Sequence, residues 1–457
     1  MSSAKEPVTR RFGNGLTVLI KEDKSHPVVS LQYWVGTGSM NEGHWQGSGL
    51  SHLLEHLVFK GTEHYSGQDL ARKVQERGGH WNAYTSVNRT VYYIDGPADS
   101  WQIFLNLLTE LVFFPTFPED ELEREKGVVR REMAMYADDP DSVAYQLLMQ
   151  TLYLKHPRRW PVLGEPAAFD CLTRQDVLDY HASRYVPNNV VLSIAGDVDA
   201  AEIFSHLELL VEDLKSRPLN RELIPHEPHQ FGSRRVRKEF AVPYSKLNLA
   251  WRLPCSGHPD TPALSALASI LGGGRSARFY EKFHDRLGLV YSIEVHSNQS
   301  ETDEGAFTIS IDVDRAQRDK VRDLVLQELR NLAQEDFTED LKRVCKQTRV
   351  SRLRRRSSAA GVASEMGADW FGARNLNLSS EWQEAIERVT TEDLHRVCST
   401  WLSSPNVTEV SLDPVGSNAA EEDGSAAGTE TALSEHVLGN GMKVVIREDH
   451  RLPLAYA

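Results

Sequence analysis

The sequence predicts an α+β protein that contains two folded units. Strand patterns rich in β-branched and aromatic residues occur among longer amphipathic helical patterns in residues 1–216, and the same mixture returns in residues 234–415. The stretch between them, 217–233, holds three prolines and few apolar residues, which is typical of a linker. At 457 residues the chain is long enough for each unit to bury its own core.

In the first unit, the predicted strands are segments of Val, Ile, Thr and aromatic residues that follow a turn signal such as Gly-Asn-Gly. They span residues 16–20, 28–35, 78–94 with its opening Gly-Gly turn, and 190–196. The predicted helices carry apolar residues three to four positions apart or begin at a capping residue such as Thr173. They span residues 49–59, 66–77, 100–113, 119–136, a segment after 138, one that starts at 172 and one after 201.

The second unit repeats this mixture of patterns. Its predicted strands span residues 235–242, 246–253, 291–296 and 306–313, and its helices end near 271, 287 and 400. The Gly-Gly-Gly at 272–274 follows a helix, whereas a phosphate-binding loop follows a strand, so we set nucleotide binding aside. A segment rich in Ser, Ala, Gly and Glu, 416–432, has the composition of a flexible linker.

The charge balance narrows the classes of partner. There are 51 basic and 65 acidic residues, which gives a net charge of −14. Nucleic acids and anionic membranes both favour a basic surface, so neither is expected as the main partner. The basic run 352–356 lies in a helical region and is interpreted as a solvated helix face rather than an RNA-binding patch.

Cysteine usage and the N-terminal sequence bear on the compartment. The four cysteines are far apart and form no C-x-x-C pair, so neither a disulfide framework nor a cysteine-bound metal is indicated. The first residues contain no apolar signal segment, and no run approaches the length of a membrane span. We therefore expect a cytoplasmic protein, or a periplasmic one if a leader has been removed.

The most informative stretch is the predicted helix 49–59. Its leucines and Val58 recur at helical spacing and form one apolar stripe. His52 and His56 lie on the other side, four residues apart, so their imidazoles are one turn apart, which suits two ligands of one tetrahedral zinc. Glu55 lies between them and completes the pattern H-x-x-E-H, the inverted form of the H-E-x-x-H metallopeptidase motif.

The chemistry of a hydrolytic zinc site requires these residue types. Two imidazoles and one carboxylate leave zinc an open position for water, and an unligated glutamate beside it can take a proton from that water. The alternative is that the two histidines only belong to the solvated polar face of an ordinary core helix. The motif alone is therefore a hypothesis, and its context has to decide.

The helix 119–136 is the obvious source of a third ligand. Glu125 and Glu132 are seven residues apart and share one face of that helix. Either could reach the metal. The helix carries three further glutamates, however, and acidic helix faces are usually only solvated.

The end of the chain repeats its beginning. Residues 436–454 match residues 10–28 with an offset of 426. The repeat predicts that the first pair of units ends near Pro414 and that residues 433–457 are the truncated start of a further unit. Two strands cannot form a core alone, so either the parent protein is longer or this tail pairs with something else.

With these motifs assembled, the chain resembles the pitrilysin/insulinase family of inverted-motif zinc metallopeptidases, which includes the mitochondrial processing peptidase. The resemblance extends over most of residues 8–414. The matching motifs occur in the same order in both, and they are Gly49-x-x-His52-x-x-Glu55-His56-x-x-Phe59-x-Gly61-Thr62, Asn82-Ala83-x-Thr85-Ser86, Glu125-x-x-Val128-Val129-x-x-Glu132-Met133, Pro161-Val-Leu-Gly164 and Gly196-Asp197.

The resemblance implies a fold, a cofactor and a set of roles. Each unit would be a mostly antiparallel sheet with helices packed on one face, and the pair would form half of a clamshell around a chamber that admits peptides or unfolded polypeptide. His52, His56 and Glu132 would bind one Zn²⁺ per chain. Glu55 would activate the zinc-bound water as general base, and Glu125 would orient a ligand histidine. The substrate would bind as an added strand along Asn82, Ala83 and Thr85.

The second unit departs from the family pattern at one position. The family has an arginine seven residues before a tyrosine in its distal unit, and both contact substrate. Here Tyr291 occupies the tyrosine position and His284 the arginine position. Histidine cannot supply the permanent forked donor of arginine. A second similar half, as a tandem continuation, a homodimer or a heterodimer partner, is therefore expected to complete the site.

Three functions compete on these residues. A zinc endopeptidase is the leading one, because all five site residues of the first unit are present. A non-catalytic or assembly subunit of a heteromeric peptidase complex is the alternative. A zinc hydrolase of a small molecule is the third, and it requires a smaller pocket than the strand around Asn82 suggests.

Overall fold

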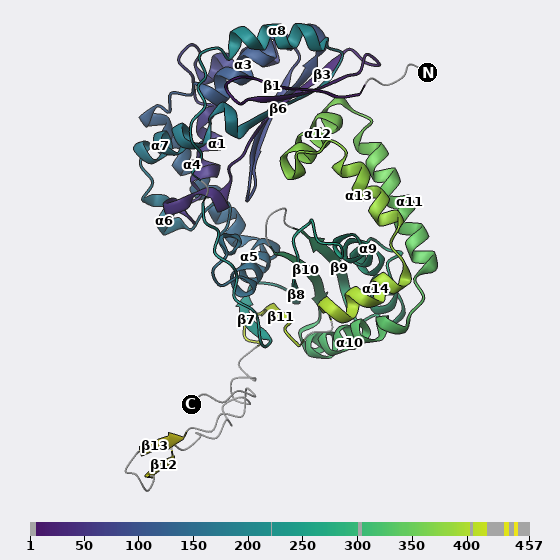
Figure 1. Ribbon diagram of the computed structural model, residues 1–457. Coiled ribbons are helices and arrows are strands. Elements are labelled where there is room, and N and C mark those ends of the chain that lie inside the picture. The colour runs from purple at the N-terminus through teal and green to yellow at the C-terminus, as the bar shows by residue number, and fades with distance from the viewer. Residues whose placement is uncertain are drawn as a thin grey trace.

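The computed structural model of the chain describes residues 6–220, 222–299, 304–402 and 405–417, together with the short strands 434–437 and 443–446. Two α+β units lie one above the other in Figure 1, and chain segments connect them along two sides. The fold class expected from the sequence is confirmed, because each unit is a mostly antiparallel sheet with its own helices on one face. No helix in this described part has the length and apolar character needed to cross a membrane.

The first sheet has six strands in the order β1-β2-β6-β3-β5-β4. All neighbours are antiparallel except β2 and β6, which are parallel. The strands are β1 Val8–Arg11, β2 Thr17–Glu22, β3 Val28–Val35, β4 His80–Thr85, β5 Thr90–Pro97 and β6 Val190–Gly196. The edge strand β4 is therefore open on one side within the described sheet, next to the helix that carries the histidines.

Two of the expected strands differ from the sequence prediction. Residues 8–35 form three strands rather than two. The sequence did not reveal β1, because its four residues are all exposed and show no alternation of buried and exposed positions. Residues 78–94 form a hairpin of β4 and β5 rather than one strand. Its turn is closed by the Ser86 amide donating to the Arg89 carbonyl at 2.8 Å, and no glycine or proline marks it in the sequence.

The helices of the first unit, apart from α5, pack on one face of this sheet. They are α1 Leu50–Val58, α2 Gly67–Gln75, α3 Trp101–Phe113, α4 Glu119–Asp138, α5 Pro140–Leu152, α6 Pro166–Asp170, α7 Arg174–Arg184 and α8 Ala200–Leu210. The apolar stripe predicted for α1 is confirmed, because its leucines and Val58 are fully buried in the core. That burial anchors α1 against the sheet and leaves its opposite side for polar residues.

The second unit repeats the strand order of the first, except that its five-stranded sheet has no counterpart of β1. Its sheet runs β7-β11-β8-β10-β9, again with one parallel pair, β7 and β11. The strands are β7 Arg234–Phe240, β8 Ser245–Leu253, β9 Val290–Asn298, β10 Gly305–Val313 and β11 Thr408–Pro414. The helices are α9 Thr261–Gly272, η6 Tyr280–Arg286, α10 Arg318–Asn331, α11 Thr338–Arg355, α12 Ala359–Ala373, α13 Leu378–Glu387 and α14 Thr391–Val397. In this correspondence α9 takes the place of α1 and β9 takes the place of β4.

Each unit also places one helix on the opposite face of the other unit's sheet, which the sequence did not predict. Helix α12 buries Ala363 and Met366 against Trp34 of β3, and α5 buries Leu148 against Ala250 of β8. The contact of α12 requires glycine at 367, because a Cβ there would lie 2.3 Å from the Trp34 ring. The exchange joins the two units through buried apolar contacts.

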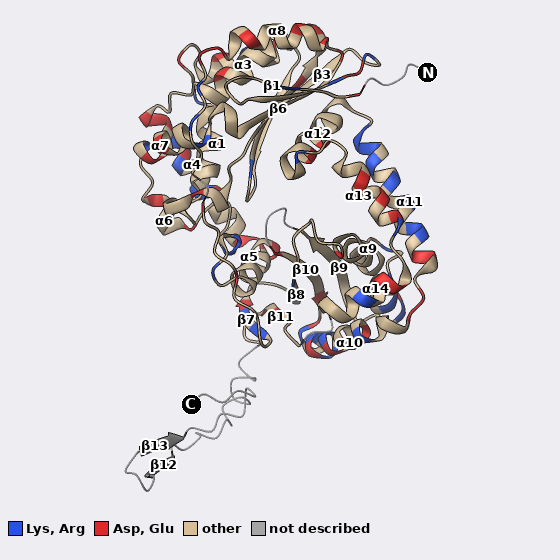
Figure 2. Cartoon of the chain, viewed as in Figure 1, with Lys and Arg blue, Asp and Glu red and all other residues tan. Residues whose placement is uncertain are grey.

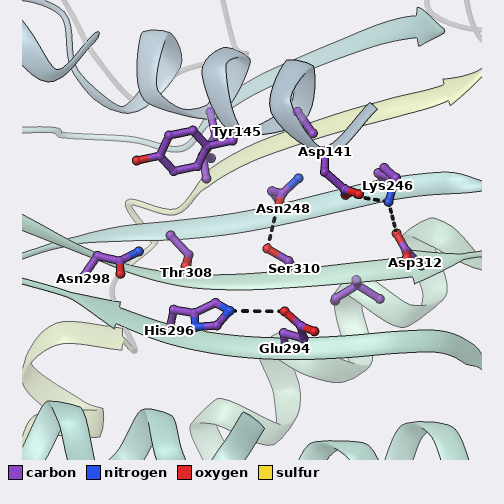
Figure 3. Close-up of a pocket in the computed structure, with 13 residues that line it drawn as sticks. Asp141, Tyr145, Lys246, Asn248, Glu294, His296, Asn298, Thr308, Ser310 and Asp312 are labelled. Atoms are coloured by element: carbon purple, nitrogen blue, oxygen red, sulfur yellow. Dashed lines mark hydrogen bonds and ion pairs between the residues drawn. The ribbon is translucent and has the colours of Figure 1, made fainter. Parts of the chain in front are cut away.

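A polar pocket of about 430 Å³ lies beside α5 on the second sheet (Figure 3). Lys246 of β8 forms ion pairs there with Asp141 of α5 at 2.7 Å and with Asp312 of β10 at 3.0 Å. Burial works against the charge on Lys246, but the two carboxylates outweigh it and raise the pKa of the amine. Lys246 is therefore an ionic connection between the first and second units.

Charged residues are spread over both units, and α11 carries a marked series of basic side chains (Figure 2). Within the predicted basic run, Arg352 and Arg356 form ion pairs with Glu365 of α12. Arg354 and Arg355 are exposed. The run is therefore partly a solvated helix face, as expected, and partly an attachment of α11 to α12.

The described strands of the tail reproduce the first hairpin. Strand β12 Ser434–Val437 pairs with β13 Lys443–Ile446, and Ser434 lies opposite Ile446. In the first hairpin Val8 lies opposite Ile20, which is the same register at the offset of 426. The predicted linker 416–432, apart from its first two residues, and the other residues of the tail lie outside the described residues.

Candidate active site

Helices α1 and α4 bring three potential metal ligands together. The rings of His52 and His56 are 4.7 Å apart between centroids on α1. Glu132 of α4 points its Oε2 atom at both, 3.8 Å from His52 Nε2 and 3.9 Å from His56 Nε2. One ligand atom from each residue lies within 4.8 Å of the others, and this is the one such group among the described residues.

The start of α1 depends on a close backbone approach. Gly49 precedes the helix with φ of 72°, a left-handed conformation that favours glycine. A Cβ at this position would lie 2.0 Å from the Leu163 carbonyl oxygen. The glycine thus lets α1 begin against the loop before α6, which sets where the histidines lie.

The three residues suit a zinc ion. Ligand atoms about 2.0–2.2 Å from one ion lie roughly 3–4 Å apart, which is the spacing seen between Glu132 and the two imidazoles. Burial, with a smaller contribution from His56, lowers the pKa of His52 to about 4, so its imidazole is neutral and able to bind a metal. Two nitrogens and one oxygen are also the donor set of many catalytic zinc sites.

Glu125 lies behind His56 rather than in the cluster. Its Oε2 atom is 3.1 Å from His56 Nδ1, and its Oε1 atom is 2.7 Å from Lys60 Nζ. Burial raises the pKa of this carboxyl, but the hydrogen bonds from His56 and Lys60 outweigh burial and lower it. The carboxylate can therefore accept the Nδ1 proton of His56 and direct the Nε2 lone pair toward Glu132.

The contact from Lys60 leads to a prediction that the sequence motifs do not suggest. The Lys60→Met variant should bind zinc roughly 10- to 100-fold more weakly, because Glu125 loses the cation that holds its carboxylate against His56. Zinc affinity is to be measured by competition with a chelator of known affinity. Lys346→Met, at an exposed position on α11, is the matched control. Equal affinities in the wild type and both variants would rule out this role.

Glu55 faces β4. Its Oε2 atom accepts a hydrogen bond of 2.5 Å from the Thr85 hydroxyl. Burial raises the pKa of Glu55 above its usual value, although the hydrogen bond opposes that shift. A carboxylate whose pKa is moved toward neutrality is a stronger base than an exposed one. Thr85, expected to bind substrate, thus also orients Glu55.

Asn82 and Ala83 lie on the same edge strand. The Asn82 side chain is exposed, and its Oδ1 atom accepts a hydrogen bond of 2.8 Å from the Ala83 amide. Strand β4 pairs with β5 on one side and is the last strand of its sheet. An extended peptide could add to its free side, close to Glu55.

The two candidates from the second unit are engaged within that unit. His284 stacks on Tyr280 with 4.3 Å between ring centroids, and its Nδ1 atom is hydrogen-bonded to Asp285 Oδ1 at 2.7 Å. The Tyr291 hydroxyl donates to Asp314 at 2.8 Å. Helix α9, the counterpart of α1, contains no histidine or carboxylate, so the second unit holds no equivalent of the ligand cluster within the described residues.

Sequence reasoning missed Glu42, which is buried at the start of α1. Its Oε1 atom accepts a hydrogen bond of 2.8 Å from the Ser51 amide, so it satisfies a helix N-terminus whose preceding residue, Gly49, has no side chain. Burial, only partly opposed by that hydrogen bond, raises the pKa of Glu42 to about 8. An isolated acidic residue in a loop has no pattern that would have revealed this.

Glu42 should make stability depend on pH. The folded protein holds a proton on Glu42 up to about pH 8, whereas the unfolded chain releases it near its ordinary pKa of about 4.3. The proton on Glu42 therefore stabilises the folded state fully below about pH 4.3. This contribution to the free energy of unfolding is lost as the pH rises from there through 8. We expect the Tm of the wild type to fall more between pH 5 and 8 than that of Glu42→Gln. Parallel Tm profiles of these two proteins, with Glu63→Gln as the exposed control, would contradict this assignment.

Comparisons with known proteins find relatives of this chain among peptidases. The model of the insulinase family (peptidase family M16) matches residues 17–165, and a model described as the peptidase M16 inactive domain matches residues 172–347. A Rickettsia felis protein described as an uncharacterized zinc protease is 27% identical over 406 residues, which cover 86% of this chain and 94% of that protein. A Mycobacterium bovis protein of the same description is 30% identical over 299 residues, covering 64% of this chain and 67% of the relative.

The solved structures agree as well. The crystal structure of a protease from Helicobacter pylori superposes with a TM-score of 0.81 and 26% identity, and it covers 90% of this chain and 100% of that one. The first unit, with the ligand cluster, corresponds to the insulinase model. The inactive-domain model begins in the last part of the first unit, at residue 172, and continues through α9 of the second unit as far as residue 347 in α11.

Proposed function

The chain belongs to the insulinase family of peptidases (peptidase family M16), and from this membership we propose that it is a zinc-dependent endopeptidase of peptides or unfolded polypeptide segments. The observation that carries the proposal is the cluster of His52, His56 and Glu132, with Glu55 between the two histidines on α1. Degenerate family subunits usually lack such a set, and here each member is present and oriented.

Each residue of the first unit has a separate part in this proposal. His52, His56 and Glu132 would hold the ion, which when bound supplies a Lewis acid for the scissile carbonyl. Glu55 takes a proton from the attacking water and passes it to the leaving amine. Thr85 keeps the Glu55 carboxylate in place, and Glu125 keeps the His56 ring in the tautomer that leaves Nε2 free.

The substrate would lie as an extended strand along the open side of β4. Main-chain hydrogen bonds along residues 82–83 read an extended backbone rather than a particular sequence. A folded protein rarely offers a free strand, so unfolded segments are favoured. A strand on this edge passes Thr85 and therefore brings its carbonyl groups close to Glu55.

A second half is part of the proposal. The second unit of this chain has His284 where a forked donor would be expected, and that ring is paired with Asp285. We propose that a similar half, as a tandem continuation, a second copy or a different chain, closes the chamber and supplies the missing substrate contacts.

The widely spaced cysteines favour the cytoplasm as the compartment.

The test uses the full chain and a reduced, alkylated, fluorescently labelled polypeptide. We expect about one zinc per chain, weak cleavage by the chain alone and faster cleavage after a similar half is added, loss of this cleavage with 1,10-phenanthroline and recovery with added zinc, and no cleavage of a folded control protein. Zinc binding without turnover, alone or mixed with a similar half from a relative, would instead identify a non-catalytic assembly subunit. Cleavage that persists after the metal is removed would contradict the proposal.

A further inference from the structure

A group of hydrogen-bonded hydroxyls lies on the buried side of α1, and the roles described so far do not involve it. We call it the hydroxyl chain, and its members are Ser51, Thr37, Thr90, Tyr92, Tyr180 and Tyr185. Five of these residues are completely shielded from solvent, and Tyr185 is 4% exposed. Their hydroxyls therefore depend on one another and on the backbone for partners, because bulk water does not reach them.

The first part of the hydroxyl chain joins α1 to α7 and to the sheet. The Tyr180 hydroxyl of α7 is hydrogen-bonded to Ser51 Oγ at 2.7 Å and to Thr37 Oγ1 at 2.6 Å. Thr37 follows β3, and its carbonyl accepts a hydrogen bond of 3.0 Å from Thr90 Oγ1 of β5. One phenol group thus holds the first turn of α1 and, through Thr37, the start of β5.

The second part of the hydroxyl chain joins the end of α7 to β5. The hydroxyls of Tyr185, which follows α7, and of Tyr92 on β5 are 2.7 Å apart. The His181 ring stacks on Tyr185 with 4.7 Å between centroids, and its Nε2 atom donates to the Val112 carbonyl at 2.9 Å. Helix α7, which packs beside α1 (Figure 1), is therefore connected to β5 along two paths.

Both ends of the hydroxyl chain adjoin residues of the proposed active site. On α1, Ser51 precedes the proposed ligand His52 and lies about one helical turn before Glu55. On the sheet, Thr90 lies opposite Thr85 in the register of β5 and β4. Thr85 donates the hydrogen bond that orients Glu55. The hydroxyl chain therefore connects the helix that carries the base to the strand pair that carries Thr85.

Packing alone does not require hydroxyls at these positions. Apolar side chains would fill the same core without polar atoms that need partners, and a buried network with an unpaired member costs stability. A fully paired network instead favours a single arrangement of the elements that it joins. Such rigidity suits a place where a helix and a strand hold reacting groups, because a misplacement of about 1 Å can lower turnover by roughly 100-fold.

We propose that the hydroxyl chain fixes α1 against the β4–β5 hairpin and that Tyr180 and Tyr185 are positioning residues for Glu55. Neither tyrosine contacts the substrate or the metal in this proposal. Tyr180 acts through Ser51 on the helix, and Tyr185 acts through Tyr92 on the strand. The inference rests on the proposed function and adds to it two residues outside the sequence motifs.

The test removes one oxygen atom at a time, with kcat measured on an unstructured peptide after the same similar half has been added. Tyr180→Phe and Tyr185→Phe should each lower kcat by roughly 10- to 100-fold and leave KM and zinc affinity within about twofold of the wild type. Tyr33→Phe is the matched control, because the Tyr33 hydroxyl is equally buried but belongs to a separate pair with Thr109 of α3, at 2.9 Å. It should lose a similar amount of Tm and keep the wild-type kcat.

A double variant tests the hydrogen bond between α7 and α1 directly. Ser51→Ala and Tyr180→Phe both break this bond, so the double variant should lose little more kcat than Tyr180→Phe alone. Losses that multiply would show that the two side chains act separately, and would overturn the proposed connection.

Hydrogen exchange of the zinc-loaded chain, followed by mass spectrometry, reports on the same connection without turnover. Tyr180→Phe should speed exchange in the first turn of α1 and in the β4–β5 hairpin, because both lose a fixed partner. Tyr33→Phe should leave the exchange of these two segments unchanged. Unchanged exchange in Tyr180→Phe would contradict the proposed role of the hydroxyl chain.

The outcomes are distinct. A wild-type protein without zinc-dependent cleavage would overturn the proposed function, while hydrogen exchange would still decide whether the hydroxyl chain holds α1 against the hairpin. An active wild type with kcat within a few-fold of it in both Tyr180→Phe and Tyr185→Phe would overturn the inference and leave the peptidase intact. Equal losses of kcat in Tyr33→Phe and Tyr180→Phe would overturn it as well, because they would reflect lost stability alone.

Discussion

The Glu55→Gln variant is expected to bind zinc like the wild type and to cleave peptides roughly 10²- to 10⁴-fold more slowly. A carboxamide can still accept the hydrogen bond of the Thr85 hydroxyl, so the local structure is kept. It cannot take a proton from water, so the base is lost while the ligands are untouched. The measurement is kcat on an unstructured peptide, together with the zinc content of the same preparation.

The matched control for this variant is Glu63→Gln, an exposed position in the loop after α1. It should retain wild-type turnover. If Glu55→Gln keeps kcat within a few-fold of the wild type, Glu55 is not the base, and another group near the cluster has that role.

The Glu132→Gln variant is expected to lose most of its zinc affinity and, with it, its activity. The loss should exceed the roughly 10- to 100-fold that is typical when a group that only contacts a ligand is changed. The change removes a charged ligand and leaves a neutral amide, which binds zinc poorly. The Tm of the metal-free protein should stay close to that of the wild type, because Glu132 is partly exposed and does not belong to the apolar core.

Glu123→Gln is the control on the same helix, because its side chain is 66% exposed on α4. It should bind zinc normally. Wild-type affinity in Glu132→Gln would remove this residue from the ligand set. A large loss of affinity in Glu125→Gln with no loss in Glu132→Gln would assign the third ligand to Glu125 instead.

The choice between these two glutamates shows what a sequence pattern leaves open. Glu125 and Glu132 are seven residues apart, so both lie on one face of α4, and helical periodicity treats them alike. The angle and position at which α4 packs on α1 decide between them. In the structure that packing directs Glu132 at both Nε2 atoms and places Glu125 between His56 Nδ1 and Lys60.

Contacts between distant segments explain the other omissions. Lys60 has no local signal because its partner, Glu125, is distant in the sequence. Glu42 has none because it lies in a loop without a repeating pattern. The exchange of α5 and α12 between the units depends on which sheet face each helix reaches. The turn between β4 and β5 contains Ser86 and Asn88 but neither glycine nor proline, so its signal in the sequence is weak.

The sequence by itself determined the parts of this protein that rest on local periodicity and on close spacing. These are the apolar stripe of α1, the pair His52 and His56 with Glu55, the two α+β units and the family resemblance, which the family models confirm. The tertiary structure alone decided which carboxylate faces the two imidazoles and which one supports them. It also decided that an apolar pocket of about 500 Å³ forms between the end of α4, α5 and the loop before α6, because a pocket is formed by residues that meet only when helices, strands and loops pack together.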